Sequence, residues 1–409
     1  HMELWAETGR FAALGCLVSG VRLATSVTLG EFYRSADAAE VTVVLDDLLG
    51  SALRFWYTRA SITENAQAAA RYYRDRLSIA GAPPQDQNLR RRFQAIAAAS
   101  LSLSDCPMKI AHGELVLHLS DGAERRLPLP PGGINVEFLL AGSEHLVGIL
   151  NGTLDSDPVL VDPERRHCAL IEFEFATVGP LCADYAALEH WLRLQLSPAT
   201  GLATRLRCEE ALLALPGLTA APALAGMPPE VQKLMRAITR VRYLAGATSP
   251  ARDLRAYQAA LFFAMLLHIL RQPLPEPPND PATILGLAHS LICVALLYER
   301  LTAGRAAVTL DRAWRSVSIQ GRMINLPPQP FRLFEYLYDR RGQVCSKQDL
   351  LREALEMRDI NTAEDIQRNQ GVLQNLVSRL REAIEPDPDH PIYLLTVRAL
   401  GYRLDLPSE

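Results

Sequence analysis

Two apolar stretches constrain this chain most, ALFFAMLLHIL at residues 260–270 and ILGLAHSLICVALLY at residues 284–298. Both are shorter than the roughly 20 residues that a membrane-spanning helix needs, and each contains a histidine. A Pro-rich segment joins them. Helices that are apolar on nearly all sides must be covered by other elements. We therefore expect a buried antiparallel helix pair in the core of a large helical domain, with no membrane contact.

The composition limits the class of protein further. With 409 residues the chain is long enough for two or three domains, and its net charge of −4 provides no overall basic field for nucleic acid. Any contact with a polyanion must therefore be local. The seven cysteines are scattered without a C-x-x-C pair, and the histidines show no metal-ligand spacing. We expect free thiols in a cytoplasmic protein, and neither a metal nor a cofactor.

The residue pattern changes along the chain. Residues 1–100 have mostly helical periodicity, and short strands follow from residue 108, with a hairpin turning at Asp121-Gly122. Helices return until about residue 302. From residue 308 the order is strands, three helices and a final hairpin. This order predicts an α+β protein with a domain boundary between residues 303 and 308.

The third helix of the last domain, in the segment 364–384, has two different faces. Leu373, Val377, Leu380 and Ile384 recur at i, i+4, i+7 and i+11 and predict one buried stripe. The other face carries amides and guanidinium groups, which can pair with base edges and phosphates in a major groove. Taken alone, such a face can also be a solvated helix surface.

The order and spacing of four motifs add a resemblance. SIQGRMINLPPQPFRLFEYL, GQVCSKQDLL, VSRLREAI and TVRALGYRL cover about the last 100 residues. This region resembles the winged-helix domain of OmpR/PhoB-type regulators. The resemblance implies that the helix 366–384 enters the major groove of double-stranded DNA and that the last hairpin is the wing. The implied DNA-binding residues are Arg368, Gln374, Asn375, Ser378, Arg379, Arg381, Thr396, Arg398 and Arg403.

The resemblance implies roles for further residues, and the sequence departs from the family pattern at some positions. Tyr402 is expected to anchor the hairpin in the core, and Gly401 to supply its tight turn. Ala399 stands where the family usually has glycine, and Leu376 and Ser378 stand where polar or basic contacts are common. The acidic segment 356–365 corresponds to a loop that contacts RNA polymerase in family activators, or is simply solvated. Proteins of this type usually bind paired half-sites, which implies a homodimer on DNA.

A second resemblance covers roughly residues 30–300. LNGTLDSDPVLVD, LIEFE, GP and DYA stand in the order of the motifs of aminoglycoside/choline phosphotransferase-like, kinase-fold proteins. It implies a degenerate phosphotransferase-like domain at residues 1–302, with a truncated N-lobe at about 1–125 and a C-lobe at about 126–302. The mostly helical domain would precede the winged helix-turn-helix domain at 308–409. The sequence does not have the pattern of a receiver domain, in which an acidic pair and a phosphoacceptor aspartate follow the strands.

The residues that would carry phosphoryl transfer are replaced. At the motif positions, Thr153 stands in place of the catalytic aspartate, Pro158 in place of the metal-binding asparagine and Glu172 in place of the second metal-binding aspartate. A threonine cannot accept the hydroxyl proton at neutral pH, and phosphoryl transfer depends on bound Mg²⁺. No lysine precedes Lys109, and no Gly-rich loop is present. The resemblance thus implies a pseudokinase with no catalytic residues. Asp155, Asp157 and Asp162 are expected to satisfy backbone donors in turns.

Together these patterns favour a bacterial DNA-binding transcriptional regulator, not an enzyme, in which an inactive kinase-like domain senses a ligand or mediates assembly. Its partners would be double-stranded DNA and either RNA polymerase or a partner protein. An alternative is a scaffold protein of a signalling or defence system, whose winged helix binds protein. A residual nucleotide-binding enzyme is a third hypothesis.

Overall fold

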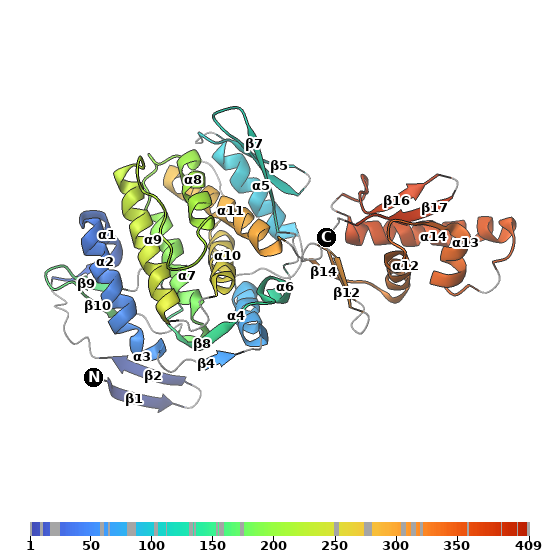
Figure 1. Cartoon of the computed structure of the whole chain (residues 1–409). Coiled ribbons are helices and arrows are strands. Elements are labelled where there is room, and N and C mark those ends of the chain that lie inside the picture. Colours follow the sequence, from blue (N-terminus) through green and yellow to red (C-terminus); the bar gives the residue numbers. More distant parts are fainter. Residues whose placement is uncertain are drawn as a thin grey trace.

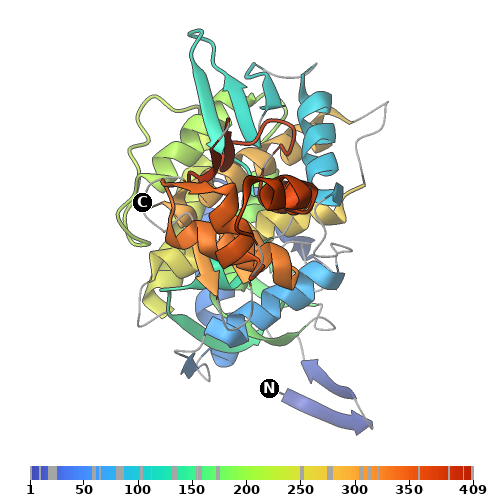
Figure 2. The ribbon, with the colours of Figure 1, turned by 90° about the vertical axis from the view of Figure 1, so that its right-hand side faces the viewer.

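The computed structural model describes residues 2–8, 11–16, 25–57, 61–63, 66–79, 87–101, 105–111, 113–130, 134, 136–152, 154, 159–171, 176–248, 253–273, 280–303, 308–311, 316–319, 322–357, 360–385, 387–398 and 400–406. Helices and small antiparallel sheets alternate along these residues, as the predicted α+β class requires. In Figure 1 the elements that follow residue 308 form a lobe of their own beside the helices, and Figure 2 views the molecule from the side of that lobe.

Side-chain caps set the first helices. Thr28 accepts the backbone N–H of Glu31 and so starts α1, and Asp37 accepts the N–H of Glu40 and starts α2. Because such caps satisfy backbone donors that a helix leaves unpaired, they start α1 and α2 as separate helices. This part comprises β1 (Met2–Thr8), β2 (Phe11–Cys16), β3 (Val27–Thr28), α1 (Leu29–Ser35), α2 (Ala38–Asp47), a π-helical turn η1 (Leu48–Ala52), α3 (Arg54–Tyr57), β4 (Ser61–Thr63), α4 (Ala66–Ile79) and α5 (Gln87–Ser100).

Three small sheets lie in the middle of the chain. The predicted hairpin at Asp121-Gly122 is confirmed, since His118 pairs with Glu124 and Gly122 has the positive φ of 84° that its turn requires. A further strand, β5, extends that hairpin to three strands. The elements are β5 (Met108–Ala111), β6 (Glu114–His118), β7 (Glu124–Pro128), α6 (Val136–Leu140), β8 (His145–Leu150), β9 (Val159–Asp162), β10 (His167–Leu170) and β11 (Thr177–Pro180). The other two sheets have the orders β11-β8-β4 and β10-β9-β3.

A run of helices follows: α7 (Cys182–Leu194), α8 (Leu202–Leu213), α9 (Pro229–Thr248), α10 (Leu254–Arg271) and α11 (Pro281–Thr302). The two apolar stretches become α10 and α11, which pack against each other in the core, as predicted. Within the described residues, α11 alone is long and apolar enough to cross a membrane, and 83% of its apolar window is buried inside the protein.

The last elements form two three-stranded sheets around three helical segments. They are β12 (Val308–Asp311), β13 (Ser316–Ile319), β14 (Arg322–Asn325), α12 (Pro328–Asp339), β15 (Val344–Ser346), α13 (Lys347–Asp349), a π-helical turn η2 (Leu350–Ala354), α14 (Ala363–Ile384), β16 (Leu394–Val397) and β17 (Gly401–Leu404). The sheet orders are β12-β13-β14 and β15-β17-β16. Their buried apolar residues, from Val317 to Leu404, form a core cluster separate from the two clusters of the preceding helices.

Candidate nucleic-acid interface

The helix α14 is set by a cap that fixes its start. The Thr362 hydroxyl accepts the N–H of Asp365 at 3.2 Å, and the Asp365 carboxylate accepts the N–H of Thr362 at 2.9 Å. This reciprocal pair satisfies two donors at the helix start. The helix then runs without a break to Ile384. A defined start fixes which side chains point inward and which point to solvent.

The buried stripe of α14 is confirmed. Leu373, Val377, Leu380 and Ile384 are all at most 3% exposed. Leu376 is buried as well, with 4% exposure. A position three residues from another on a helix shares its face, so Leu376 widens the stripe. Packing in the core therefore requires an apolar residue at Leu376, which does not lie on the exposed face of the helix.

The opposite face of α14 is open to solvent. Its exposed residues include five of the predicted contact residues, Arg368, Gln374, Asn375, Ser378 and Arg379. Within the described part of the chain, the side chains of Gln374, Asn375 and Arg379 have no hydrogen bond or ion pair, so their polar groups are available to a partner. Arg368 lies 3.8 Å from Asp365 in a solvent-exposed pair, which water and salt weaken. Glu364 and Glu382 are exposed on the same helix and moderate its charge.

Arg381, which the sequence places among the contact residues, is bonded inside the domain. Its guanidinium donates to the carbonyl oxygen of Leu394 at 2.7 and 3.0 Å and to the hydroxyl of Thr396 at 2.8 Å. It is half-buried, whereas Thr396 is exposed. These bonds join the C-terminal end of α14 to β16. The geometry therefore gives Arg381 a positioning role for the wing.

Glu385 completes this connection. Its carboxylate accepts the backbone N–H groups of Ile392 at 2.8 Å, Tyr393 at 3.0 Å and Leu394 at 2.7 Å, and only 2% of Glu385 is exposed. We call Arg381 and Glu385, one helical turn apart, the wing clamp. Glu385 is not among the site residues predicted from the sequence. Its position directly after the helix, four residues beyond Arg381, is the signal that could have drawn attention to it.

The hairpin β16–β17 has the predicted orientation at its described positions. Tyr402 is 6% exposed and packs in the core, while Arg398 is exposed and, within the described residues, has no intrachain partner. Arg403 is half-buried and donates to Asp405 at 3.0 Å. Ala399 lies outside the described residues. Arg398 is thus the cation of the hairpin most available to an outside ligand.

The predicted role of Gly401 needs correction. Gly401 lies within β17 and pairs with Ser346 and Val397, and it does not have a positive φ. A Cβ atom there would collide with the carbonyl group of Cys345 and lie 3.0 Å from the Cα atom of Ser346. Glycine is required because the neighbouring strand approaches closely, and not because of a turn.

The segment before α14 is anchored at one end. Ile360 is buried with 2% exposure, and Glu356 pairs with Arg332 at 2.9 Å in an exposed ion pair. Residues 358–359 lie outside the described part. Part of the acidity of the segment 356–365 is therefore used within the domain, because Asp365 caps α14.

A second group of motif residues lies among the helices. The buried carboxylate of Asp184, at the start of α7, accepts the N–H groups of Asn151 at 2.7 Å and Gly152 at 2.9 Å and the hydroxyl of Tyr57 at 3.0 Å. Burial raises the pKa of Asp184, although these hydrogen bonds oppose the shift. Asp184 thereby joins two of the runs that resemble phosphotransferases. Thr153, Asp155, Asp157, Pro158 and Glu172 lie outside the described residues.

The loop around Asp162 behaves as expected of an Asp-rich turn. Asp162 is fully buried, and its Oδ1 atom accepts the N–H groups of Glu164 at 3.1 Å and Arg165 at 3.2 Å. Its carboxylate thus satisfies backbone donors in the β9–β10 turn.

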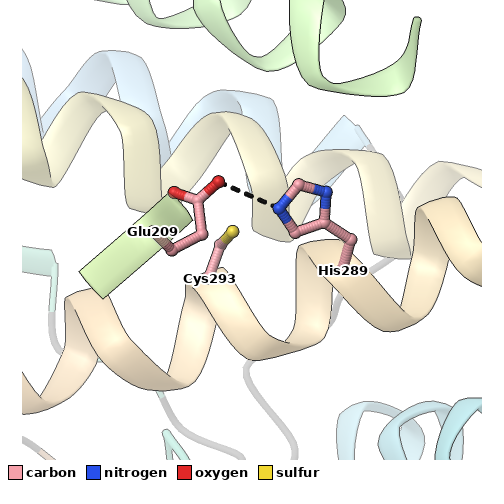
Figure 3. Close-up of side chains that lie close together, drawn as sticks. All are labelled: Glu209, His289 and Cys293. Carbon is pink, nitrogen blue, oxygen red and sulfur yellow. Dashed lines mark hydrogen bonds and ion pairs between the residues drawn. The ribbon is translucent and has the colours of Figure 1, made fainter. Parts of the chain in front are cut away.

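A buried cluster of possible metal ligands lies between α8 and α11. Atoms of Glu209, His289 and Cys293 lie within 4.8 Å of one another, with His289 and Cys293 one turn apart on α11 (Figure 3). The Glu209 carboxylate already accepts Arg193 at 2.8 and 2.9 Å and contacts the Nε2 atom of His289 at 2.9 Å. The other ring nitrogen of His289 lies 3.4 Å from the guanidinium of Arg205.

The pKa shifts in this cluster are those expected of an ion-pair network. Burial by itself would raise the pKa of Glu209, but Arg193 and the His289 bond outweigh it and lower that pKa. Burial raises the pKa of the Cys293 thiol well above its usual value, and a protonated thiol is a poor metal ligand. Glu189 continues the network by pairing with Arg193 at 2.8 Å and Arg242 at 2.8 Å. We interpret the cluster as a structural network.

A helix-turn-helix unit followed by a hairpin that is held against its last helix defines a winged-helix domain. Residues 321–404 match the family model described as "Transcriptional regulatory protein, C terminal". The predicted OmpR/PhoB-type resemblance is therefore confirmed for this C-terminal part of the chain. The match covers about a fifth of the chain, so it identifies a domain and leaves the remainder open.

Relatives of known name match about a quarter of this chain. The Sensory transduction protein RegX3 of Mycolicibacterium smegmatis (strain ATCC 700084 / mc(2)155) is 36% identical over 105 residues, which cover 26% of this chain and 42% of that protein. RegX3 of Mycobacterium tuberculosis (strain ATCC 25618 / H37Rv) is 37% identical over 98 residues, 24% of this chain and 40% of the relative. The Transcriptional regulatory protein AfsQ1 of Streptomyces coelicolor (strain ATCC BAA-471 / A3(2) / M145) is 34% identical over 107 residues, 26% of this chain and 44% of the relative. The chain spans about two fifths of the length of these relatives.

Proposed function

We propose that this protein is a DNA-binding transcriptional regulator whose winged helix reads double-stranded DNA. The observation that carries the proposal is the exposed face of α14, where Asn375 and Arg379 have no partner within the described residues. Amide and guanidinium groups are the side chains that pair with adenine and guanine edges in the major groove. Arg398 on the hairpin would reach the backbone or the minor groove beside it.

The predicted contact residues fall into two groups under this proposal. Arg368, Gln374, Asn375, Ser378, Arg379, Thr396 and Arg398 are exposed and would contact DNA. Arg381 and Arg403 are bonded within the domain, at Leu394 and Asp405 respectively, and would act by positioning the hairpin. AfsQ1, a relative named as a transcriptional regulatory protein, is 34% identical to this chain over 107 residues, which supports the assignment.

The test is selection of duplexes from a random library with the full chain, followed by measurement of Kd across a salt series. A protein that neutralises phosphates loses affinity as salt rises, with a slope of about −0.9 for each phosphate contact. The Arg379→Ala/Arg398→Ala variant should bind more weakly and with a shallower slope. Arg207→Ala, an exposed arginine on α8, is the matched control. The proposal fails if wild-type protein selects no duplex even at low salt.

A second function is favoured by one feature of the same domain. Leu400 is 61% exposed beside the hairpin turn and Ile392 is 57% exposed at its base. Apolar side chains that are open to solvent on a winged helix suit a protein partner. A scaffold protein of a signalling or defence system would use this surface. Loss of a co-purifying partner in Leu400→Ser, with DNA binding unchanged, would favour this function.

For the remainder of the chain we propose a degenerate phosphotransferase-like domain, residues 1–302, that senses a ligand or partner and lacks enzymatic activity, followed by the winged helix at 308–409. The contact of Asp184 with Asn151 and Gly152 supports the resemblance because it brings separate motif runs together. The replacement of the catalytic base by Thr153 supports inactivity.

This part of the proposal has separate tests. Limited proteolysis should cut between residues 303 and 308 and release a folded C-terminal fragment. ATP with Mg²⁺ should leave the melting temperature of the full chain unchanged, whereas a residual nucleotide-binding enzyme would be stabilised by its ligand. A homodimer on DNA is expected, and the mass of the complex with a selected duplex would decide that point.

A further inference from the structure

The exposed face of α14 contains a stripe that mirrors the buried one. Arg368, Val372, Asn375 and Arg379 recur at i, i+4, i+7 and i+11, so they lie along one line of the helix. Three of the four carry groups that can pair with DNA. Val372 carries none, although 45% of it is exposed. An apolar side chain therefore lies in the middle of the surface that would face the major groove.

The residue before it, Gly371, is equally unexpected at this place. Glycine is the least favourable helix residue after proline, because it loses the most backbone freedom on folding. Among the residues that the structure describes, a Cβ atom at Gly371 would meet nothing within 4 Å, and the φ of Gly371 is not positive. Neither packing nor backbone conformation within the domain thus requires glycine here. The space that a side chain would occupy lies on the exposed side of the helix.

We infer that Gly371 and Val372 form the apolar part of the DNA-reading surface: Val372 contacts the 5-methyl group of a thymine, and Gly371 lets the helix backbone approach the groove closely enough for that contact. Thymine is the one base with a methyl group in the major groove, and apolar side chains recognise it there. Asn375 and Arg379, on the same line, would pair with the neighbouring bases. This inference rests on the proposed DNA-binding function.

The charge of the face supports a close, partly apolar contact. Exposed Glu364 and Glu382 lie on the same helix as Arg368 and Arg379, so acids and bases there are equal in number. A surface with so little net charge gains little from phosphate neutralisation. Recognition at this face must therefore come from base edges, to which a thymine methyl group contributes without any charge.

The experiment uses the full chain and the duplex that it selects from a random library. Each thymine is replaced in turn by deoxyuridine, which pairs identically but lacks the methyl group. The wild type should lose about fourfold in affinity at one thymine of each half-site, as expected for one buried methyl group. Val372→Ala should bind the thymine and uracil duplexes equally at that position. Gly371→Ala should bind at least about tenfold more weakly, with a melting temperature no lower than that of the wild type.

Two matched variants control for general effects. Val43→Ala removes an equally exposed valine, 45% exposed, from α2. Gly50→Ala adds a methyl group to a helical glycine whose Cβ position also has no described atom within 4 Å. Both should keep the full thymine preference and affinity.

The inference is overturned if uracil is tolerated everywhere by the wild type, if Val372→Ala keeps the preference, or if Gly371→Ala binds as tightly as the wild type. Failure of the wild type to select any duplex is a different result, which overturns the proposed function as well.

Discussion

Removal of the Glu385 carboxylate should release the hairpin from α14. In the folded domain this carboxylate accepts three successive N–H groups, of Ile392, Tyr393 and Leu394. Two of these, at Tyr393 and Leu394, are buried. Water can replace the acceptor at Ile392, which is exposed, but not readily at the other two. Glu385→Ala therefore leaves two buried donors without an acceptor.

The magnitude follows from the cost of such donors. Each buried unsatisfied donor costs roughly 1–3 kcal/mol, and the variant also avoids the burial of a charge, which offsets part of the loss. We expect the local opening free energy of the hairpin to fall by about 2–4 kcal/mol. That corresponds to roughly 30- to 700-fold faster exchange of the amides of residues 392–394. The Arg381 bonds to Leu394 and Thr396 should weaken with it.

Hydrogen exchange of the full chain, read by mass spectrometry, is the assay. Glu382→Ala is the matched control, because Glu382 is an exposed glutamate on the preceding turn of the same helix. Glu385→Gln keeps one acceptor oxygen and should lie between the wild type and Glu385→Ala. Amide exchange in Glu385→Ala within threefold of both wild type and Glu382→Ala would refute the reasoning.

The remaining predictions concern the buried network, the pH dependence and the salt dependence. Glu209→Gln should lower the free energy of unfolding by roughly 3 kcal/mol, because it leaves buried Arg193 with one carboxylate partner. Urea denaturation measures this change. The control Glu210→Gln, on the same helix, should change the free energy of unfolding by less than about 0.5 kcal/mol. Burial, with a smaller contribution from Arg271, lowers the pKa of His268 from 6.5 to about 4. Protonation of His268 therefore favours the unfolded state, so its contribution to stability is complete above pH 6.5 and should fall by about 3 kcal/mol as the pH drops to 4. In urea denaturations across this pH range, His268→Gln should abolish this contribution to the dependence of the unfolding free energy on pH. An unchanged pH dependence would contradict the assignment. Arg398→Ala should weaken binding to all duplexes alike and reduce the salt slope by about 0.9, and a loss of affinity for only some sequences would instead indicate a base contact.

Several features of the fold follow from local patterns in the sequence. The buried stripe of α14 could be predicted because side chains at i, i+4 and i+7 share a face of any α-helix, whatever surrounds it. The turn at Asp121-Gly122 was equally predictable, since it depends on the backbone freedom of a glycine that has a φ of 84°. The burial of α10 and α11 followed from their apolar character on all sides.

Other roles depended on neighbours that the sequence does not identify. The resemblance placed Leu376 where polar or basic contacts are common, but the packing of the folded domain buries it in the core. Gly401 was assigned to a turn, while the close approach of Cys345, more than fifty positions away, is what excludes a side chain there. Arg381 was assigned to DNA contact, and the position of β16 turned its guanidinium inward.

The sequence by itself determined the secondary structure of the winged helix and the direction in which most of its side chains point, because these depend on spacing along one chain. The tertiary structure alone decided which polar groups pair: Glu385 with the hairpin amides, Asp184 with the Asn151–Gly152 backbone, and Glu209 with Arg193. Hydrogen bonds require atoms about 3 Å apart in a definite orientation. Only the folded chain fixes that proximity, and it leaves Asn375, Arg379 and Arg398 without partners in the described chain, at the surface where DNA is proposed to bind.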